Sequence, residues 1–122
     1  MMNVEEIRDY CLKKPCVTES TPFDEVTLVF KVCEKMFAVV PLDETECKVA
    51  LKCDPEKAIS LREHFPSAVV PAWHFNKKHW NSVIAGQAPS RRHVEQWIDD
   101  SYNLVVAGFT RKQKEMLKEA DG

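Results

Sequence analysis

Alternation of apolar and polar residues dominates the first half of the chain. Residues 27–33 and 46–53 follow the period of two that is typical of strands with one buried face. Residues 36–42 are almost entirely apolar, which is typical of a central strand. Only two or three residues separate these segments, so the pattern predicts consecutive antiparallel strands joined by hairpins. Shorter apolar segments predict three further strands, at residues 18–22, 68–72 and 80–85.

Apolar residues at helical spacing, preceded by capping residues, predict four helices. The expected starts carry Asn3, Asp54, Ser90 and Thr110, whose side chains accept hydrogen bonds from amides of the first turn. Glu6 and Gln113 complete capping boxes at the first and last of these starts. The expected helices cover residues 3–13, 54–65, 91–107 and 110–120.

This order of elements predicts an α+β fold, a two-layer sandwich in which an antiparallel meander sheet carries the N-terminal and C-terminal helices. A chain of 122 residues builds one core, so residues 1–122 are expected to form a single domain. No apolar run approaches the roughly 20 residues of a membrane span, and the acidic N-terminus lacks a signal-peptide core. We therefore expect a cytoplasmic protein with no membrane partner.

The charge distribution is uneven although the net charge is only −2. The segment from residue 64 to residue 94 contains no Asp or Glu, whereas it holds four of the 17 Lys and Arg residues and all four histidines. Dedicated duplex-DNA binders are usually basic, with pI values above about 9. The sequence pI of about 6.1 therefore limits any nucleic-acid contact to a local patch, and the acid-free segment is the place where we expect it.

Enzymatic chemistry has little support in the sequence. There is no G-x-S-x-G, P-loop or dinucleotide motif, and only three glycines are present. The five cysteines include no C-x-x-C pair, and we expect them to be reduced, with Cys47 and Cys53 as core residues. His74 and His79 have no Cys or carboxylate nearby in the sequence to complete a metal site. We expect no catalytic residues, no metal and no cofactor.

Several motifs resemble the MmcQ/YjbR-like family. They are the stretches Thr21-Pro22-Phe23-Asp24, Leu51-Lys52-Cys53-Asp54-Pro55-Glu56, Val69 to Asn81 and Ser101-Tyr102-Asn103-Leu104-Val105. The block His74-Phe75-Asn76-Lys77-Lys78-His79-Trp80 is the most specific of them. The resemblance implies a CyaY-like, frataxin-type fold and a DNA-binding role of the double-wing type. The chain departs from the family at Cys16 and at Cys33-Glu34, where relatives commonly have glycine.

These observations favour a small non-enzymatic protein that contacts DNA through its acid-free surface. The expected contacts are Lys77, Lys78, Arg91 and Arg92 to phosphates, with His74, Asn76, His79 and Trp80 shaping the turn or meeting sugar and base. The alternative is a module that binds a protein or a small anionic ligand on the same aromatic surface and has no nucleic-acid role. A third interpretation is architectural: Trp73 and Trp80 are core residues, and the lysines are solvated turn residues.

Overall fold

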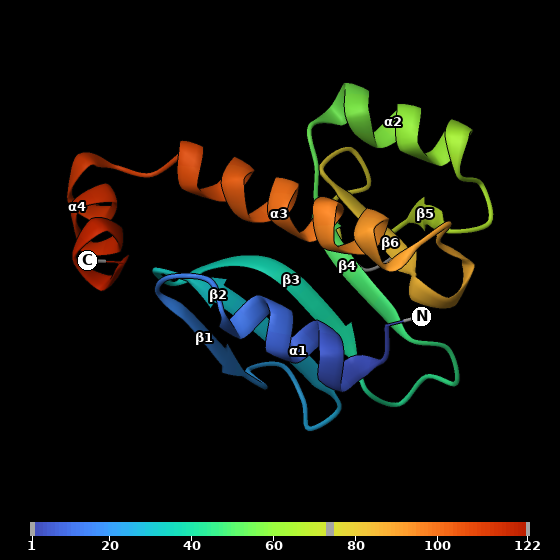
Figure 1. The fold of residues 1–122 in the computed structure, drawn as a ribbon, viewed down its shortest axis with the longest axis horizontal. Helices are drawn as coiled ribbons and strands as arrows, with labels where there is room; N and C mark the ends of the chain where they lie inside the picture. Colours follow the sequence, from blue (N-terminus) through green and yellow to red (C-terminus); the bar gives the residue numbers. More distant parts are fainter. Residues whose placement is uncertain (1, 73–74, 122) are drawn as a thin grey trace.

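The computed structural model describes residues 2–72 and 75–121. Within these residues, a six-stranded antiparallel sheet carries helices on one face (Figure 1), which confirms the predicted α+β architecture. The elements are α1 (Val4–Leu12), β1 (Val17–Ser20), β2 (Thr27–Val32), β3 (Lys35–Pro41), β4 (Lys48–Lys52), α2 (Pro55–His64), β5 (Val69–Pro71), β6 (Trp80–Ile84), a 3-10 turn (Ala85–Gln87), α3 (Arg91–Ala107) and α4 (Arg111–Asp121).

The strand order is β1-β2-β3-β4-β6-β5. The predicted meander is present in β2, β3 and β4, and β1 forms one edge as expected. The last strand, β6, lies between β4 and β5, so the short β5 forms the other edge. The sequence pattern predicted the two late strands but not this order.

The capping residues place the helix starts as predicted. Asn3 accepts a hydrogen bond from the Glu6 amide at 2.9 Å, and the Glu6 carboxylate accepts from the Asn3 amide in return. Asp54 and Ser90 cap α2 and α3. Such caps satisfy first-turn amides that have no partner within the helix.

The main core lies between the helices and the sheet. Its largest fully buried side chains are apolar residues of α1, α3 and the strands: Ile7, Ile98, Val94, Phe30, Phe37, Val32, Val40, Val49 and Val69. Leu61 and Phe65 bring α2 and the segment after it against the same core. Because these helices cover one face only, the sheet's other face is left without a helical layer.

A smaller cluster covers part of that second face. It contains Val29, Val39, Ala50 and Trp80. The Trp80 ring stacks on Phe75 with centroids 5.0 Å apart, and Trp80 is only 9% exposed. The Trp80 ring is therefore part of the architecture. Trp73 lies outside the described residues.

Strands β3 and β4 meet over a short distance. Their paired residues are Ala38 with Leu51 and Val39 with Ala50. The next position in this register would join Phe37 to Lys52, and there the hydroxyl of Ser101 in α3 takes the place of a ladder bond. It donates to the Phe37 carbonyl at 2.5 Å and accepts from the Lys52 amide at 2.9 Å.

A register shift in the β2–β3 ladder lies at Phe37, the residue whose carbonyl accepts from Ser101. Phe30 pairs with Ala38 whereas Lys31 pairs with Met36, so Phe37 is an extra residue on β3. A bulge of this kind re-aims a side chain. The Phe37 ring packs edge-on against Tyr102 of α3, with centroids 5.4 Å apart. The bulge thus turns both the carbonyl and the ring of Phe37 to the helix.

Within the described residues, three other than glycine have positive φ angles: Cys16 (63°), Cys33 (45°) and Glu34 (70°). Cys33 and Glu34 form the two-residue turn between β2 and β3, and positive φ at both positions is typical of a type I′ hairpin turn. Glycine adopts this conformation without the clash that a Cβ atom causes. The structure therefore explains why glycine is expected at the positions where this chain has Cys16 and Cys33-Glu34.

We predict that Glu34→Gly stabilises the protein. Glu34 is exposed, and the substitution removes left-handed strain, so the free energy of unfolding should rise by about 1 kcal/mol in urea denaturation. Lys35→Gly, one residue further along at the exposed start of β3, is the control and should lower that free energy. Equal losses in both variants would contradict the strain at Glu34.

Candidate functional site

The predicted DNA-binding residues fall into two groups at opposite ends of β6. Asn76, Lys77, Lys78 and His79 form the turn that leads into the strand, whereas Arg91 and Arg92 begin α3 beyond its far end. The five residues of β6 span roughly 13 Å at strand spacing. His74 lies outside the described residues. The structure therefore does not gather the predicted cations into one continuous patch.

Hydrogen bonds to Asn76 shape the first group. The Asn76 side chain accepts from the Lys78 amide at 3.0 Å. Its carbonyl accepts from the amides of His79 at 3.0 Å and Trp80 at 2.9 Å. The His79 carbonyl accepts from the Cys53 amide at 2.7 Å, which joins the turn to the end of β4. Asn76 is thus used by the turn itself, as the turn-shaping role predicted.

Arg62 of α2 also reaches this turn. Its guanidinium donates to the Lys77 carbonyl at 3.1 Å and to the Asn81 side-chain oxygen at 3.2 Å. Asn81 is only 2% exposed and donates to the Ala58 carbonyl of α2 at 3.2 Å. We call Arg62, Lys77 and Lys78 the cationic turn.

The charge of Arg62 is not neutralised by the bonds that hold its side chain. Both of its acceptors are uncharged oxygens. Among the described residues, no ion pair within 4.0 Å joins Arg62 or Lys78 to a carboxylate. Arg62 was not predicted as a site residue. Its position in the last turn of the helix that precedes this motif could have indicated a contact with the turn.

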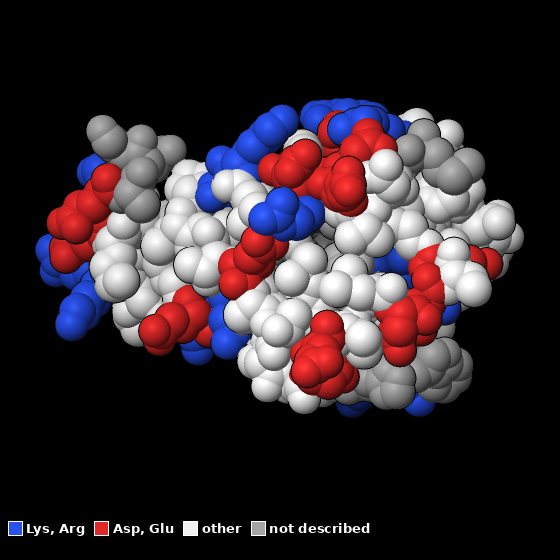
Figure 2. All heavy atoms as spheres, turned by 90° about the horizontal axis from the view of Figure 1, so that it is seen from below, with Lys and Arg blue, Asp and Glu red and all other residues white. Residues whose placement is uncertain are grey.

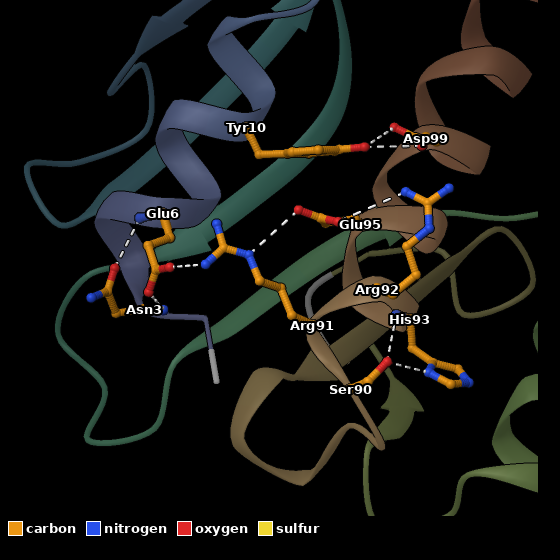
Figure 3. A network of polar contacts seen from close by, with 9 residues as sticks. All are labelled: Asn3, Glu6, Tyr10, Ser90, Arg91, Arg92, His93, Glu95 and Asp99. Carbon is orange, nitrogen blue, oxygen red and sulfur yellow. Dashed lines mark hydrogen bonds and ion pairs between the residues drawn. The ribbon is translucent and has the colours of Figure 1, made fainter.

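Arg91 and Arg92 have acidic neighbours. Arg91 forms ion pairs with Glu6 of α1 and with Glu95 one turn further along α3 (Figure 3). Arg92 lies 3.8 Å from Glu95 and its side chain is 72% exposed. The segment from residue 64 to residue 94 is therefore acid-free in sequence but not in space, because Glu6 returns to it from the N-terminal helix.

Further along α3, a second set of polar contacts joins this helix to α1. The Tyr10 hydroxyl donates to both carboxylate oxygens of Asp99, at 2.8 and 3.0 Å (Figure 3), and Lys14 forms an ion pair with the same carboxylate. Burial, followed by the hydrogen bond to Asp99, raises the pKa of Tyr10 to about 12. These contacts satisfy their charges internally, which indicates a structural role.

The surface carries both charges close together. On the face shown in Figure 2, Lys and Arg side chains alternate with Asp and Glu side chains, and no broad basic expanse is visible. A phosphate-binding site on this face would accordingly be small and local.

A groove lies on the helix-free face of the sheet, with a volume of about 610 Å³. Its apolar lining includes Val39, Ala50, Val70 and Phe75, and its rim includes Asp24, Asp43 and Glu44. The aromatic surface near Trp80 was predicted from the sequence as a possible binding surface, whereas this groove was not predicted. The loops that form the walls come from three separate parts of the chain, so no local motif indicated their meeting.

Four cysteines, Cys11, Cys33, Cys47 and Cys53, lie in surroundings that raise the pKa of the thiol. Burial raises the pKa of Cys11 to about 12, and burial together with the contact to Cys16 raises the pKa of Cys33 to about 11. The sulfur atoms of Cys16 and Cys33 are 3.1 Å apart. A protonated thiol is a weak nucleophile and a weak metal ligand. In the described part of the chain, no three His, Cys, Asp or Glu side chains are grouped to hold a metal ion.

The helices that the structure describes include none with both the length and the apolar character needed to cross a bilayer.

A family model described as YjbR matches residues 12–104. The uncharacterised protein YbdF of Escherichia coli O157:H7 is 32% identical over 114 residues, covering 93% of each chain. The uncharacterised protein YjbR of Escherichia coli K12 is 31% identical over 116 residues, covering 95% of this chain and 98% of YjbR.

Two solved structures share the fold. The crystal structure of Deinococcus radiodurans protein DR2400, with a domain of the DUF419 family model, has a TM-score of 0.87 and 35% identity over 97% of this chain and 89% of its own. A Pseudomonas syringae protein has a TM-score of 0.69 and 26% identity over 84% of this chain and 98% of its own.

We predict that Arg62→Met loosens the cationic turn. The variant keeps the aliphatic part of the side chain but loses both hydrogen bonds, so the amides of residues 77–81 should exchange with solvent about tenfold faster. Arg92→Met, which removes only a long surface ion pair, is the control and should leave these amides unchanged. Unchanged exchange in Arg62→Met, measured by mass spectrometry or NMR, would show that Arg62 does not order the turn.

Proposed function

Because the chain belongs to the YjbR family, and the sequence resemblance to MmcQ/YjbR-like proteins implies a DNA-binding role of the double-wing type, we propose that it is a small non-enzymatic protein that contacts DNA through the cationic turn. In this proposal Arg62, Lys77 and Lys78 neutralise phosphates. His79 stands beside them at the start of β6. The proposal also includes the CyaY-like, frataxin-type fold that the resemblance implies and a location in the cytoplasm.

The observation that supports the proposal most is that the hydrogen bonds of Arg62 fix its side chain without neutralising its charge. A guanidinium held by two uncharged oxygens keeps its full positive charge, and it is fixed next to a turn with two adjacent lysines. A preorganised cationic group loses less conformational entropy on binding a phosphate than a free side chain does. Lys78 adds a charge that no described carboxylate pairs with.

The other predicted contacts have smaller parts in this proposal. Arg91 and Arg92 lie at the far end of β6 and interact with Glu6 and Glu95, so a phosphate would have to displace those carboxylates. Asn76 and Trp80 shape and support the turn. The β2–β3 hairpin has Glu34 at its tip, where a like charge repels phosphate.

Binding to DNA is expected to be weak, because the chain's net charge is −2 and the cationic turn supplies only two or three phosphate contacts. Two or three phosphate contacts on B-DNA predict a slope of about −2 to −3 for log K against log salt concentration, because each contact releases about 0.9 counterion. The proposal therefore describes weak, salt-sensitive binding with little sequence preference, since phosphate contacts carry no sequence information.

The alternative, a protein- or small-ligand-binding module without a nucleic-acid role, is favoured by one specific observation, the groove on the helix-free face. The groove does not include the cationic turn. The two surfaces can therefore be tested separately.

We predict that Lys77→Ala/Lys78→Ala reduces the salt slope of DNA binding by about 2 units. Fluorescence anisotropy with a labelled duplex of about 20 base pairs, from about 20 to 200 mM salt, measures it. The matched control is Lys112→Ala/Lys114→Ala on α4, where both lysines are exposed and outside the ion pairs found among the described residues. It removes the same charge and should leave the slope unchanged.

Two results would contradict the proposal. One is the absence of binding at the lowest salt concentration. The other is an equal loss in the α4 control, because it would show a response to net charge and not to the turn. Arg91→Ala/Arg92→Ala separates the two predicted groups and should change the slope by less than the Lys77→Ala/Lys78→Ala variant does.

A further inference from the structure

A row of paired residues forms the floor of the groove on the helix-free face. Val39 of β3 pairs with Ala50 of β4, Ala50 with Ser82 of β6, and Ser82 with Val70 of β5. All four residues line the groove. Four adjacent strands at about 4.8 Å spacing give the floor a length of roughly 14 Å across the sheet. Three of its four side chains are apolar.

Three connecting segments form the walls, and hydrogen bonds or ring stacking hold each of them. The Leu42 amide donates to the Val26 carbonyl at 2.6 Å, which joins the segment after β3 to the segment before β2. The Asp24 carboxylate accepts from the Val26 amide at 2.9 Å. On the opposite side, Phe75 is held by its stacking on Trp80. Contacts within the protein thus hold the described wall residues in place.

Large apolar side chains continue from the groove onto the protein surface. Phe23 is 61% exposed and Val26 is 40% exposed, and both line the groove. Leu42, which is 44% exposed, lies beside them because its amide is bonded to Val26. Contiguous exposed apolar surface of this kind marks interaction sites in soluble proteins. Leu42 is not part of the groove lining, so the exposed apolar surface continues past the groove.

The rim of the groove is acidic. Among the described residues that line the groove, Asp24, Asp43 and Glu44 are acidic and Lys48 is the one cation, and Lys48 lies 3.0 Å from Glu44. Within the described residues, Asp24 and Asp43 have no ion pair with Lys, Arg or His. Two carboxylates thus remain uncompensated beside an apolar floor. This arrangement attracts a cation and repels phosphate.

We propose that the groove binds a short basic segment of a partner protein. One or two large apolar side chains of the segment lie on the Val39–Ala50 floor and against Phe23 and Phe75, and its Lys or Arg side chains meet Asp24 and Asp43. A floor of roughly 14 Å matches four or five residues of extended chain. This inference goes beyond the proposed DNA contact and uses a different surface of opposite charge.

A peptide-display selection tests the proposal. Random 12-residue peptides are selected on the wild-type protein and counter-selected on the groove variant Phe23→Ser/Asp24→Asn/Asp43→Asn. All three substitutions lie on connecting segments, and Asp24→Asn keeps a side-chain oxygen that can accept from the Val26 amide. The expected peptides combine an excess of Lys and Arg with at least one large apolar residue.

The selected peptide is then synthesised and its affinity is measured by fluorescence anisotropy. Binding to the groove variant should be at least about tenfold weaker than binding to the wild type. The matched control, Ile59→Ser/Glu56→Gln/Glu63→Gln, removes one exposed apolar residue and two exposed acids from α2 and should bind within about twofold of the wild type. Circular dichroism melting establishes that both variants are folded.

Several outcomes would overturn the proposal. They are the absence of enriched peptides, enrichment of acidic peptides, or equal binding to the groove variant. Spermine and dodecylamine are included as competitors. If either binds the groove while no peptide is selected, the ligand is a small cation and not a protein segment. The groove variant should retain the salt slope of DNA binding, so failure here is distinguishable from failure of the cationic turn.

Discussion

The hydroxyl of Ser101 is the contact on which the arrangement of this fold depends. Strands β3 and β4 pair at only two positions. These two pairs join the three strands β1-β2-β3 to the three strands β4-β6-β5 in one sheet. Ser101 is completely buried and bonds to both strands at the next position of the register. An unpaired buried amide or carbonyl costs about 1–3 kcal/mol, so a single side chain from α3 stabilises the junction between β3 and β4.

One of the two candidate binding surfaces, the groove, depends on this junction. The groove floor crosses from Val39 in one half to Ala50, Ser82 and Val70 in the other, so its shape is set by how the halves meet. The cationic turn lies entirely in the second half, where Arg62 of α2 and the start of β6 converge. One surface is acidic with an apolar floor and the other is cationic. A protein with a net charge near zero thereby presents two distinct local chemistries.

Local signals predicted most of the fold, whereas contacts between distant segments were not predictable. Capping residues such as Asn3 and Ser90 act within one turn of helix, and alternation acts within one strand, so both can be recognised in the sequence. Ser101 lies within the predicted helix 91–107, but its partners are 49 and 64 residues away. The contact of Arg91 with Glu6 could not be predicted because the two residues are 85 positions apart, and its other partner, Glu95, lies just outside the acid-free segment. The groove was not predictable for the same reason, because its walls come from segments around residues 24, 43 and 75, which are far apart in the sequence.

Native-state hydrogen exchange of Ser101→Ala tests the central role of this junction most directly. The account predicts that the free energy of unfolding falls by about 2–4 kcal/mol, because two buried backbone groups lose their partner. It also predicts that the amides at the β3–β4 junction, residues 37–39 and 50–52, lose more protection than those within the β2–β3 ladder. Ser60→Ala in α2, where the hydroxyl is exposed, is the matched control and should be nearly neutral. A Ser101→Ala variant within about 0.5 kcal/mol of the wild type, with uniform protection across the sheet, would contradict the account.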